Sequence, residues 1–152
     1  MAKRQFKCDG LDELISKLDK LTDAYPLLKA SLYDGAGILA DEIKRRCPTE
    51  ELKKSVSIAK FDQGNGRVGT AVVFAGYDST HKTKQFPNGV PNALIAATYE
   101  SGTSIRSNGK GKNRGAIKKH PFIQPAIRAC RERANNAMQK QLDEQISNIM
   151  EG

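Results

Sequence analysis

One short motif, Asn65-Gly66, constrains the fold of this chain more than any other feature. Asn-Gly favours the tight turn that joins two antiparallel strands. Before it, residues 55–61 alternate between apolar and polar side chains, which is the period of a half-buried strand. After it, residues 68–77 are rich in β-branched and aromatic side chains. We therefore predict a central antiparallel hairpin over residues 55–77, and a third strand beside it stays open.

The segment before the hairpin, residues 9–54, has the periodicity of helices, and residues 1–8 form a basic N-terminal arm. The first helix is predicted to begin after Asp9, whose side chain can cap it, and to end near Ala24. Its apolar side chains recur at intervals of three and four residues: Leu11, Leu14, Ile15, Leu18 and Leu21. Such a stripe predicts packing against the core, and the alternative is a contact with another subunit.

A second helix is predicted from Pro26 to about Arg46, because proline suits the first turn of a helix. Gly35 and Gly37 lie inside it, and each costs about 1 kcal/mol of helix stability relative to alanine. We expect these glycines where another backbone comes close. Thr49 is then placed to cap a short helical turn that leads into the hairpin.

The longest periodic segment is a C-terminal helix over residues 125–150, opened by Pro125. At 1.5 Å per residue it would be roughly 37 Å long, which is more than so small a sheet needs. Two arrangements stay open. Either the helix packs against the first two helices, or its distal half projects and offers an apolar stripe to a partner. The stripe consists of Met138, Leu142, Ile146 and Ile149.

Residues 78–124 are predicted to be two long loops separated by a short helix that starts at an Asn92 cap. The second loop carries six basic side chains and no acidic one: Arg106, Lys110, Lys112, Arg114, Lys118 and Lys119. Glycines between them predict flexibility. Such a tract can order on an acidic protein surface or on phosphates, or it stays solvated. Structural anchors are predicted at its two ends: Tyr99, Glu100, Gly102, Pro121, Phe122 and Pro125.

A length of 152 residues fits a single domain. We predict an α+β fold: two N-terminal helices and a long C-terminal helix packed on a small antiparallel sheet built around the central hairpin, with two long flexible loops. No apolar run approaches the roughly 18 residues of a membrane span, so we expect no membrane partner. Cys8, Cys47 and Cys130 are far apart and form no CxxC, as is typical of reduced thiols in a cytoplasmic protein.

The sequence offers no set of residues for catalysis, for a cofactor or for a metal. His81 and His120 lack the spacing of metal ligands. Residues 109–112 contain lysine and glycine but lack the serine or threonine and the preceding strand of a phosphate-binding loop. Arginines near Cys47 could lower its thiol pKa, but chance placement at a helix end explains it as well. We predict that the protein is not an enzyme, since a hydrolase would need a nucleophile, a base and an orienting group.

The net charge of +8 makes nucleic acid an alternative partner. However, 17 acidic residues accompany 25 basic ones, so the charge also fits an ordinary surface with a local excess. Tryptophan is absent and aromatic residues make up 6%, which argues against a surface on which bases stack. A small basic nucleic-acid-binding module that acts through residues 106–119 is therefore the alternative function, and it is not favoured.

Several motifs, taken in their order along the chain, resemble those of a known family. The clearest two are Tyr99-Glu100-Ser101-Gly102-Thr103 and His120-Pro121-Phe122-Ile123-Gln124-Pro125-Ala126. Weaker ones are Gly10-Leu11-Asp12-Glu13-Leu14 and the run Leu39-Ala40-Asp41-Glu42-Ile43-Lys44 that ends at Pro48, followed by Leu52 and Ser55. The chain resembles the small minor tail proteins, also called tail-completion or head–tail joining proteins, of lambda-like long-tailed bacteriophages and prophages. The basic tract between the two clearest motifs is longer and more basic than the family pattern.

The resemblance implies a non-enzymatic component of the virion. Such proteins form a ring, commonly a hexamer, at the neck or at the head-proximal end of the tail. They contact copies of themselves and neighbouring tail or head–tail connector proteins. The resemblance also implies a location in the assembled virion, and in the host bacterial cytoplasm during assembly.

Overall fold

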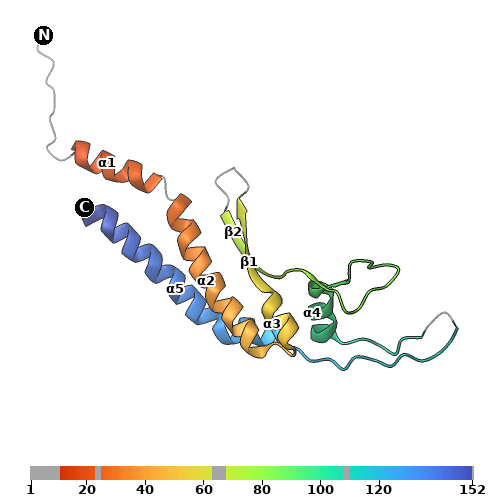
Figure 1. The fold of residues 1–152 in the computed structure, drawn as a ribbon. Helices are drawn as coiled ribbons and strands as arrows, with labels where there is room; N and C mark the ends of the chain where they lie inside the picture. Colours follow the sequence, from red (N-terminus) through yellow and green to blue (C-terminus); the bar gives the residue numbers. More distant parts are fainter. Residues whose placement is uncertain (1–10, 23–24, 63–67, 108–109, 152) are drawn as a thin grey trace, which may run out of the picture.

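A computed structural model describes residues 11–22, 25–62, 68–107 and 110–151 (Figure 1). The predicted N-terminal arm, the Asp9 cap, the helix end near Ala24 and the Asn65-Gly66 turn lie outside these ranges. The described part contains five helices and two small antiparallel sheets. The predicted α+β class is confirmed in this coarse form.

Two long helices, α2 (Tyr25–Arg46) and α5 (Ile123–Glu151), lie side by side and form the spine of the molecule (Figure 1). The packing explains Gly35, because a Cβ placed there would lie 2.7 Å from the Cγ and Sδ of Met138 on α5. The neighbour of this glycine is therefore the flexible end of a side chain and not a backbone, and Met138 would have to move to admit a Cβ. At Gly37 a Cβ would meet nothing within 4 Å. The prediction that another backbone approaches both glycines is wrong.

An ionic cluster also joins the two helices. Glu42 on α2 is only 4% exposed and accepts hydrogen bonds from Arg45 at 2.6 Å and Arg46 at 2.7 Å. Its second oxygen accepts one from Arg133 on α5 at 3.3 Å. The hydrogen bonds from Arg45 and then Arg46 lower the pKa of Glu42 to about 2. The carboxylate is therefore ionised at neutral pH and holds arginines of both helices.

The predicted hairpin is confirmed, and it is shorter than residues 55–77. Strand β1 (Val56–Asp62) pairs antiparallel with β2 (Val68–Phe74) and packs on α2. Residue 55 ends the short helix α3 (Glu50–Ser55), and residue 77 belongs to another strand. Thr49 caps α3 as predicted, because its Oγ1 accepts a hydrogen bond from the backbone of Leu52 at 3.3 Å.

The core lies where the C-terminal half of α2, the helices α3 and α4 (Asn92–Ser101) and the start of α5 meet the hairpin. Its buried apolar residues are Ala40, Ile43, Leu52, Val56, Ala96, Phe122 and Ala126. The ring of Phe122 packs edge-on against Phe74 of β2, with the two ring centroids 5.9 Å apart. This small core fixes the base of α4 and of α5.

The first predicted loop contains strands that the sequence did not reveal. Strand β3 (Tyr77–Asp78) pairs antiparallel with β4 (Val90–Pro91) and brings the two ends of the loop together. Helix α4 then follows, but Asn92 is its first residue and not its cap. The Asn92 side chain donates to the carbonyl of Ala75 at 2.7 Å, so it fastens α4 to the end of the hairpin.

The C-terminal helix begins two residues earlier than predicted, at Ile123, and packs along α2 and then α1 (Leu11–Thr22). Near its end, the Nζ of Lys17 on α1 donates to the carbonyl of Met150 at 2.8 Å. Of the predicted contact stripe, Met138, Leu142 and Ile149 are half-buried. Ile146 is 41% exposed. The arrangement with α5 packed against the first two helices is therefore the one observed.

The prediction that the apolar stripe of α1 faces the core is wrong. Three of its residues are exposed: Leu14 by 46%, Ile15 by 46% and Leu18 by 50%. The structure does not describe the side chains of Leu11 and Leu21. Because α1 contacts α5 at one end of the molecule, away from the hairpin and α4, it cannot direct this stripe into the core (Figure 1).

Candidate functional site

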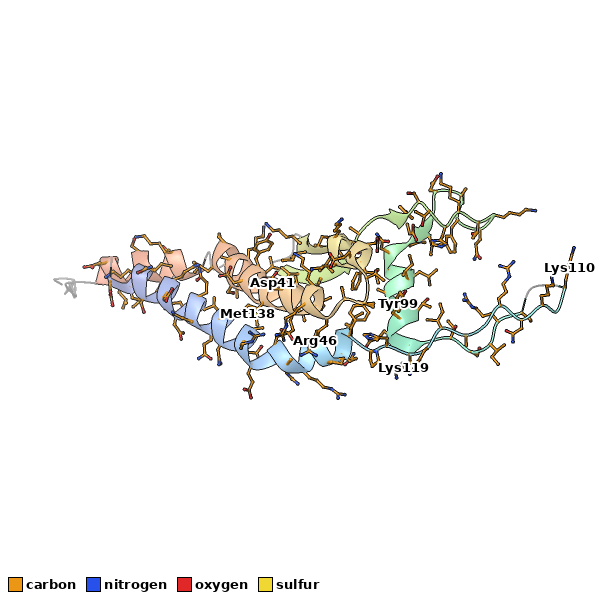
Figure 2. All side chains as sticks on the ribbon, turned by 60° about the horizontal axis from the view of Figure 1, so that its bottom comes forward. Asp41, Arg46, Tyr99, Lys110, Lys119 and Met138 are labelled. Atoms are coloured by element: carbon orange, nitrogen blue, oxygen red, sulfur yellow. The ribbon has the colours of Figure 1, made fainter. Side chains whose placement is uncertain are left out.

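Two arms extend from α4 at the end of the molecule opposite α1 (Figures 1 and 2). The first arm is residues 79–89, between β3 and β4. The second arm is residues 102–119, between α4 and α5, and Lys110 lies at its tip (Figure 2). Both arms coincide with the two predicted loops.

The second arm is a paired ribbon and not a featureless loop. Backbone hydrogen bonds cross it from Thr103 to Ile117 at 2.9 Å and from Arg106 to Gly115 at 3.1 Å. An isolated antiparallel bridge lies nearer the tip. The two halves of the arm therefore support each other, although the arm leaves the body of the protein.

At the base of the second arm, Gly102 allows the two halves to come together. Its φ of 73° is a conformation that favours glycine, and a Cβ there would lie 2.9 Å from the backbone nitrogen of Lys119. Next to it, the backbone of His120 donates to the carbonyl of Tyr99 at 2.8 Å. The close approach at Gly102 thus sets the position at which the arm returns to the body.

Glu100, at the end of α4, caps the beginning of α5. One carboxylate oxygen accepts the backbone N–H groups of Phe122 at 2.7 Å and Ile123 at 2.8 Å, and the other accepts that of Gln124 at 3.1 Å. The next residue, Pro125, has no N–H group. All N–H groups that the first turn of a helix leaves without an internal partner are therefore accounted for. This cap also explains why α5 begins before the proline.

The charge state of Glu100 follows from the same contacts. Burial by itself would raise its pKa, but the backbone N–H groups of Ile123, Phe122 and Gln124 favour the charged form and outweigh burial. The pKa of Glu100 is therefore lowered, and the positive end of the α5 dipole faces an anion.

The structure brings most of the predicted anchors together at this base. Glu100 and Gly102 act as described, and Pro125 lies in the first turn of α5. The side chain of Phe122 is 1% exposed. Tyr99 is half-buried against the core, whereas Pro121 is exposed at the surface.

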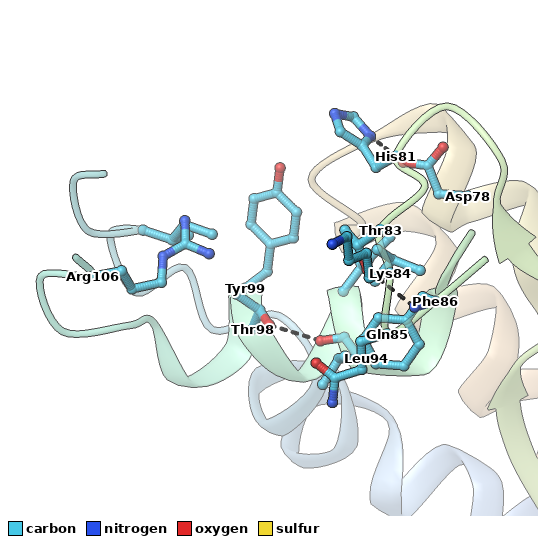
Figure 3. A pocket seen from close by; sticks show the side chains of 13 residues that line it. Asp78, His81, Thr83, Lys84, Gln85, Phe86, Leu94, Thr98, Tyr99 and Arg106 are labelled. Atoms are coloured by element: carbon cyan, nitrogen blue, oxygen red, sulfur yellow. Dashed lines mark hydrogen bonds and ion pairs between the residues drawn. The ribbon is translucent and has the colours of Figure 1, made fainter. Parts of the chain in front are cut away.

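Between the arms lies a cleft of about 750 Å³ with α4 as its floor (Figure 3). The apolar lining residues come from α4, from β4 and from both arms: Phe86, Val90, Leu94, Ile95, Tyr99 and Ile117. Leu94 is 45% exposed. Three side chains that are basic or can become so stand at the rim, namely His81, Lys84 and Arg106. The cleft is therefore an apolar surface bordered mainly by basic groups.

The rim of the first arm is held by Asp78. Its carboxylate accepts hydrogen bonds from the hydroxyl and the backbone N–H of Thr80, and its Oδ2 lies 2.7 Å from the Nδ1 of His81 (Figure 3). The hydrogen bonds from Thr80 and then His81 lower the pKa of Asp78 to about 2. An ionised Asp78 therefore fixes His81 at the edge of the cleft.

The two groups of predicted contact residues lie at opposite ends of the molecule. The six basic side chains, Arg106 to Lys119, are all exposed on the second arm, and Arg106 also lines the cleft. The α5 stripe lies along the other end, beside α2 and α1 (Figure 1). Sequence reasoning missed the cleft, and the one available signal was the presence of Phe86 and Val90 in an otherwise polar loop.

The described residues contain no group of three or more His, Cys, Asp or Glu side chains placed to hold a metal ion. Burial raises the pKa of Cys47, so the nearby basic groups do not activate its thiol. Cys130 is buried in the spine, and Cys8 lies outside the description.

Comparisons with protein-family models, with curated proteins and with solved structures found no match for this chain. Within the described ranges, every helix is too short or too polar to cross a bilayer. The function must therefore be argued from residues and geometry.

Proposed function

We propose that this protein is a structural component of a long-tailed phage particle, a tail-completion or head–tail joining protein. It assembles with copies of itself into a ring, and the six-fold number common in such rings is our working expectation. It contacts neighbouring tail or connector proteins at the neck, and it is located in the virion and, during assembly, in the host bacterial cytoplasm.

One observation carries this proposal. The two clearest motifs of the resemblance, residues 99–103 and 120–126, are joined in space, because Glu100 of the first caps the helix that the second opens. Residues 22 to 24 positions apart thus form one structural unit. A joint pattern of this kind is stronger support for the resemblance than two separate short matches.

The extended shape gives further support. The two arms leave the body of the protein at one end, and Leu14, Ile15 and Leu18 of α1 are exposed at the other (Figure 1). Surface of this kind suits a protein that is covered by neighbours in an assembly.

The proposal assigns no catalytic step. The carboxylates with lowered pKa values, Glu42, Asp78 and Glu100, each hold other parts of the chain through hydrogen bonds. A perturbed carboxylate marks a candidate active site only when it faces a space for substrate with suitable partners. Of the three, Asp78 lines the cleft, and the hydrogen bonds from Thr80 and His81 explain its shift, as the partners of Glu42 and Glu100 explain theirs.

The test is deletion of the gene from the prophage that carries it, followed by induction and electron microscopy. We expect unjoined heads and tails and a loss of infectious particles, both restored by the wild-type gene. Purified wild-type virions should contain the protein by mass spectrometry. Normal infectious particles after deletion, together with absence of the protein from purified virions, would rule out the proposed function.

A nucleic-acid-binding module is the second candidate, and the second arm favours it. The six exposed Arg and Lys side chains of this arm have no acidic residue among them, since residues 101–119 contain no Asp or Glu. Binding of duplex DNA would weaken with salt with a slope of about −0.9 per phosphate contact on a double-logarithmic plot. A protein that does not bind duplex DNA even at low salt would exclude this candidate.

A further inference from the structure

The two ends of the molecule differ in charge. All charged side chains of the second arm are basic, and Lys84 of the first arm lines the same cleft as Arg106 of the second. At the other end, residues 143–151 of α5 contain three acids and no base. In helix α1 the exposed Glu13 and Asp19 are balanced by Lys17 and Lys20, and Lys17 pairs with Glu13 at 3.0 Å, so the excess of acid comes from the end of α5. A chain with a net charge of +8 therefore has one end that is locally acidic.

The acidic end is also apolar. Leu14 and Ile15 of α1 are each 46% exposed, and Ile146 and Met150 of α5 are 41% and 40% exposed. The helices α1 and α5 contact each other, so these side chains belong to one end of the molecule (Figure 1). We call α1 together with residues 143–151 of α5 the helical end.

The cleft between the arms has the complementary character. Its floor offers Leu94, which is 45% exposed, and its walls offer Phe86 from the first arm and Ile117 from the second. Its rim carries Lys84, Arg106 and His81, and the one acid there, Asp78, is hydrogen-bonded to Thr80 and His81 (Figure 3). An apolar groove with basic borders fits an amphipathic helix with acidic flanks, which is a recurring mode of recognition.

We propose that the helical end of one copy docks into the cleft of a second copy. The occupant cannot be the same copy's helical end, because the two surfaces lie at opposite ends of the spine (Figure 1). Contacts between two different surfaces of identical copies build a ring when the rotation closes. This inference rests on the self-assembly part of the proposed function and names the two surfaces that make the contact.

The experiment measures the mass of the full chain by light scattering over a range of concentrations. One variant reverses charge at the cleft, Lys84→Glu with Arg106→Glu. A second reverses charge at the helical end, Asp19→Lys with Asp143→Lys. A control, Lys54→Glu with Arg128→Glu, matches the charge change of the cleft variant at exposed positions outside both surfaces. Circular dichroism checks that each variant is folded.

We expect each of the two test variants to raise the Kd of self-association at least tenfold, which corresponds to about 1.4 kcal/mol. The control should associate like the wild type. An equimolar mixture of the two test variants should recover association, because the reversed cleft then meets a reversed helical end. Leu94→Glu provides a second cleft variant, and its exposed position makes unfolding no obstacle.

The outcomes separate this inference from the proposed function. A wild type that associates while both test variants associate equally well overturns the docking but leaves the ring. A loss confined to one of the two variants, or a mixture that stays dissociated, also overturns it. A wild type that stays monomeric at every concentration contradicts the self-assembly itself. Loss of duplex-DNA binding in the cleft variant, with self-association unchanged, would assign the cleft to nucleic acid.

Discussion

Removal of the Glu100 carboxylate should destabilise the protein, because it caps the start of α5. In the variant Glu100→Ala, the backbone N–H groups of Phe122, Ile123 and Gln124 lose their acceptor. The start of α5 is then held by the packing of Phe122 and Ala126 in the core, and the base of the second arm by the backbone hydrogen bond from His120 to Tyr99.

The magnitude follows from three terms. Loss of a helix cap costs typically about 1 kcal/mol and up to about 2. Hydrogen bonds to a charged acceptor contribute about 1.5–3 kcal/mol each when they are fully shielded, and they are not additive. Water can reach this half-buried carboxylate and replaces part of the loss. We therefore expect about 2 kcal/mol for Glu100→Ala and about 1 for Glu100→Gln, which keeps one carbonyl oxygen.

Thermal unfolding monitored by circular dichroism measures this difference. For a chain of this size, 2 kcal/mol corresponds to a decrease of Tm of roughly 4–8 °C. The control is Glu132→Ala, an exposed acid on α5, which should change the stability by less than about 0.5 kcal/mol.

The pH dependence gives an independent check. The pKa of Glu100 is lowered from its ordinary value of 4.5, so its contribution is complete above that pH and is lost as the pH falls through the lower folded value. The difference in the free energy of unfolding between the wild type and Glu100→Gln should therefore become smaller as the pH falls. The capping role would be refuted if Glu100→Ala had the same Tm as the wild type at neutral pH. It would also be refuted if the difference in stability between the wild type and Glu100→Gln stayed constant down to about pH 3.

Three further predictions concern glycines and salt. Gly37→Ala should stabilise the protein by roughly 0.5–1 kcal/mol in urea unfolding, whereas Gly35→Ala should stabilise it less, because Met138 must move away from the added Cβ. Equal effects of the two changes would contradict the packing of α2 on α5. Gly102→Ala should cost about 1–3 kcal/mol and more than Gly111→Ala, which has the same positive φ but open space around it. Self-association should weaken as salt is raised from about 0.05 M to about 0.5 M, since exposed charges are then screened; an increase with salt would favour a purely apolar contact.

Local signals predicted most of the elements. Pro26 lies in the first turn of α2, and Thr49 caps α3, because both positions depend on backbone geometry within a few residues. The alternation before Asn65-Gly66 likewise predicted two strands in one hairpin, which is observed. These features need no information from distant parts of the chain.

The missed features depend on contacts between distant residues. The start of α5 could not be placed correctly, because its cap comes from Glu100 on another helix. The strands β3 and β4 are two residues long, too short for a periodic pattern. The reason for Gly35 lies about a hundred positions away at Met138. The cleft could not be predicted for the same reason, because its lining comes from three segments that are separate in the sequence.

The stripe of α1 shows a different limit. Its spacing correctly predicted an amphipathic helix, but spacing does not say what covers the apolar face. The exposure of Leu14 and Ile15 shows that this chain by itself does not cover it. The sequence also allows the alternative that this face contacts another subunit, and we propose that the cleft of a second copy covers it.

Sedimentation equilibrium of the purified full-length protein tests self-assembly most directly. We predict a reversible, concentration-dependent increase from 16.7 kDa toward an integer multiple of that mass, with a sixfold multiple as the working expectation. A single species of 16.7 kDa from micromolar to millimolar concentration would contradict the account.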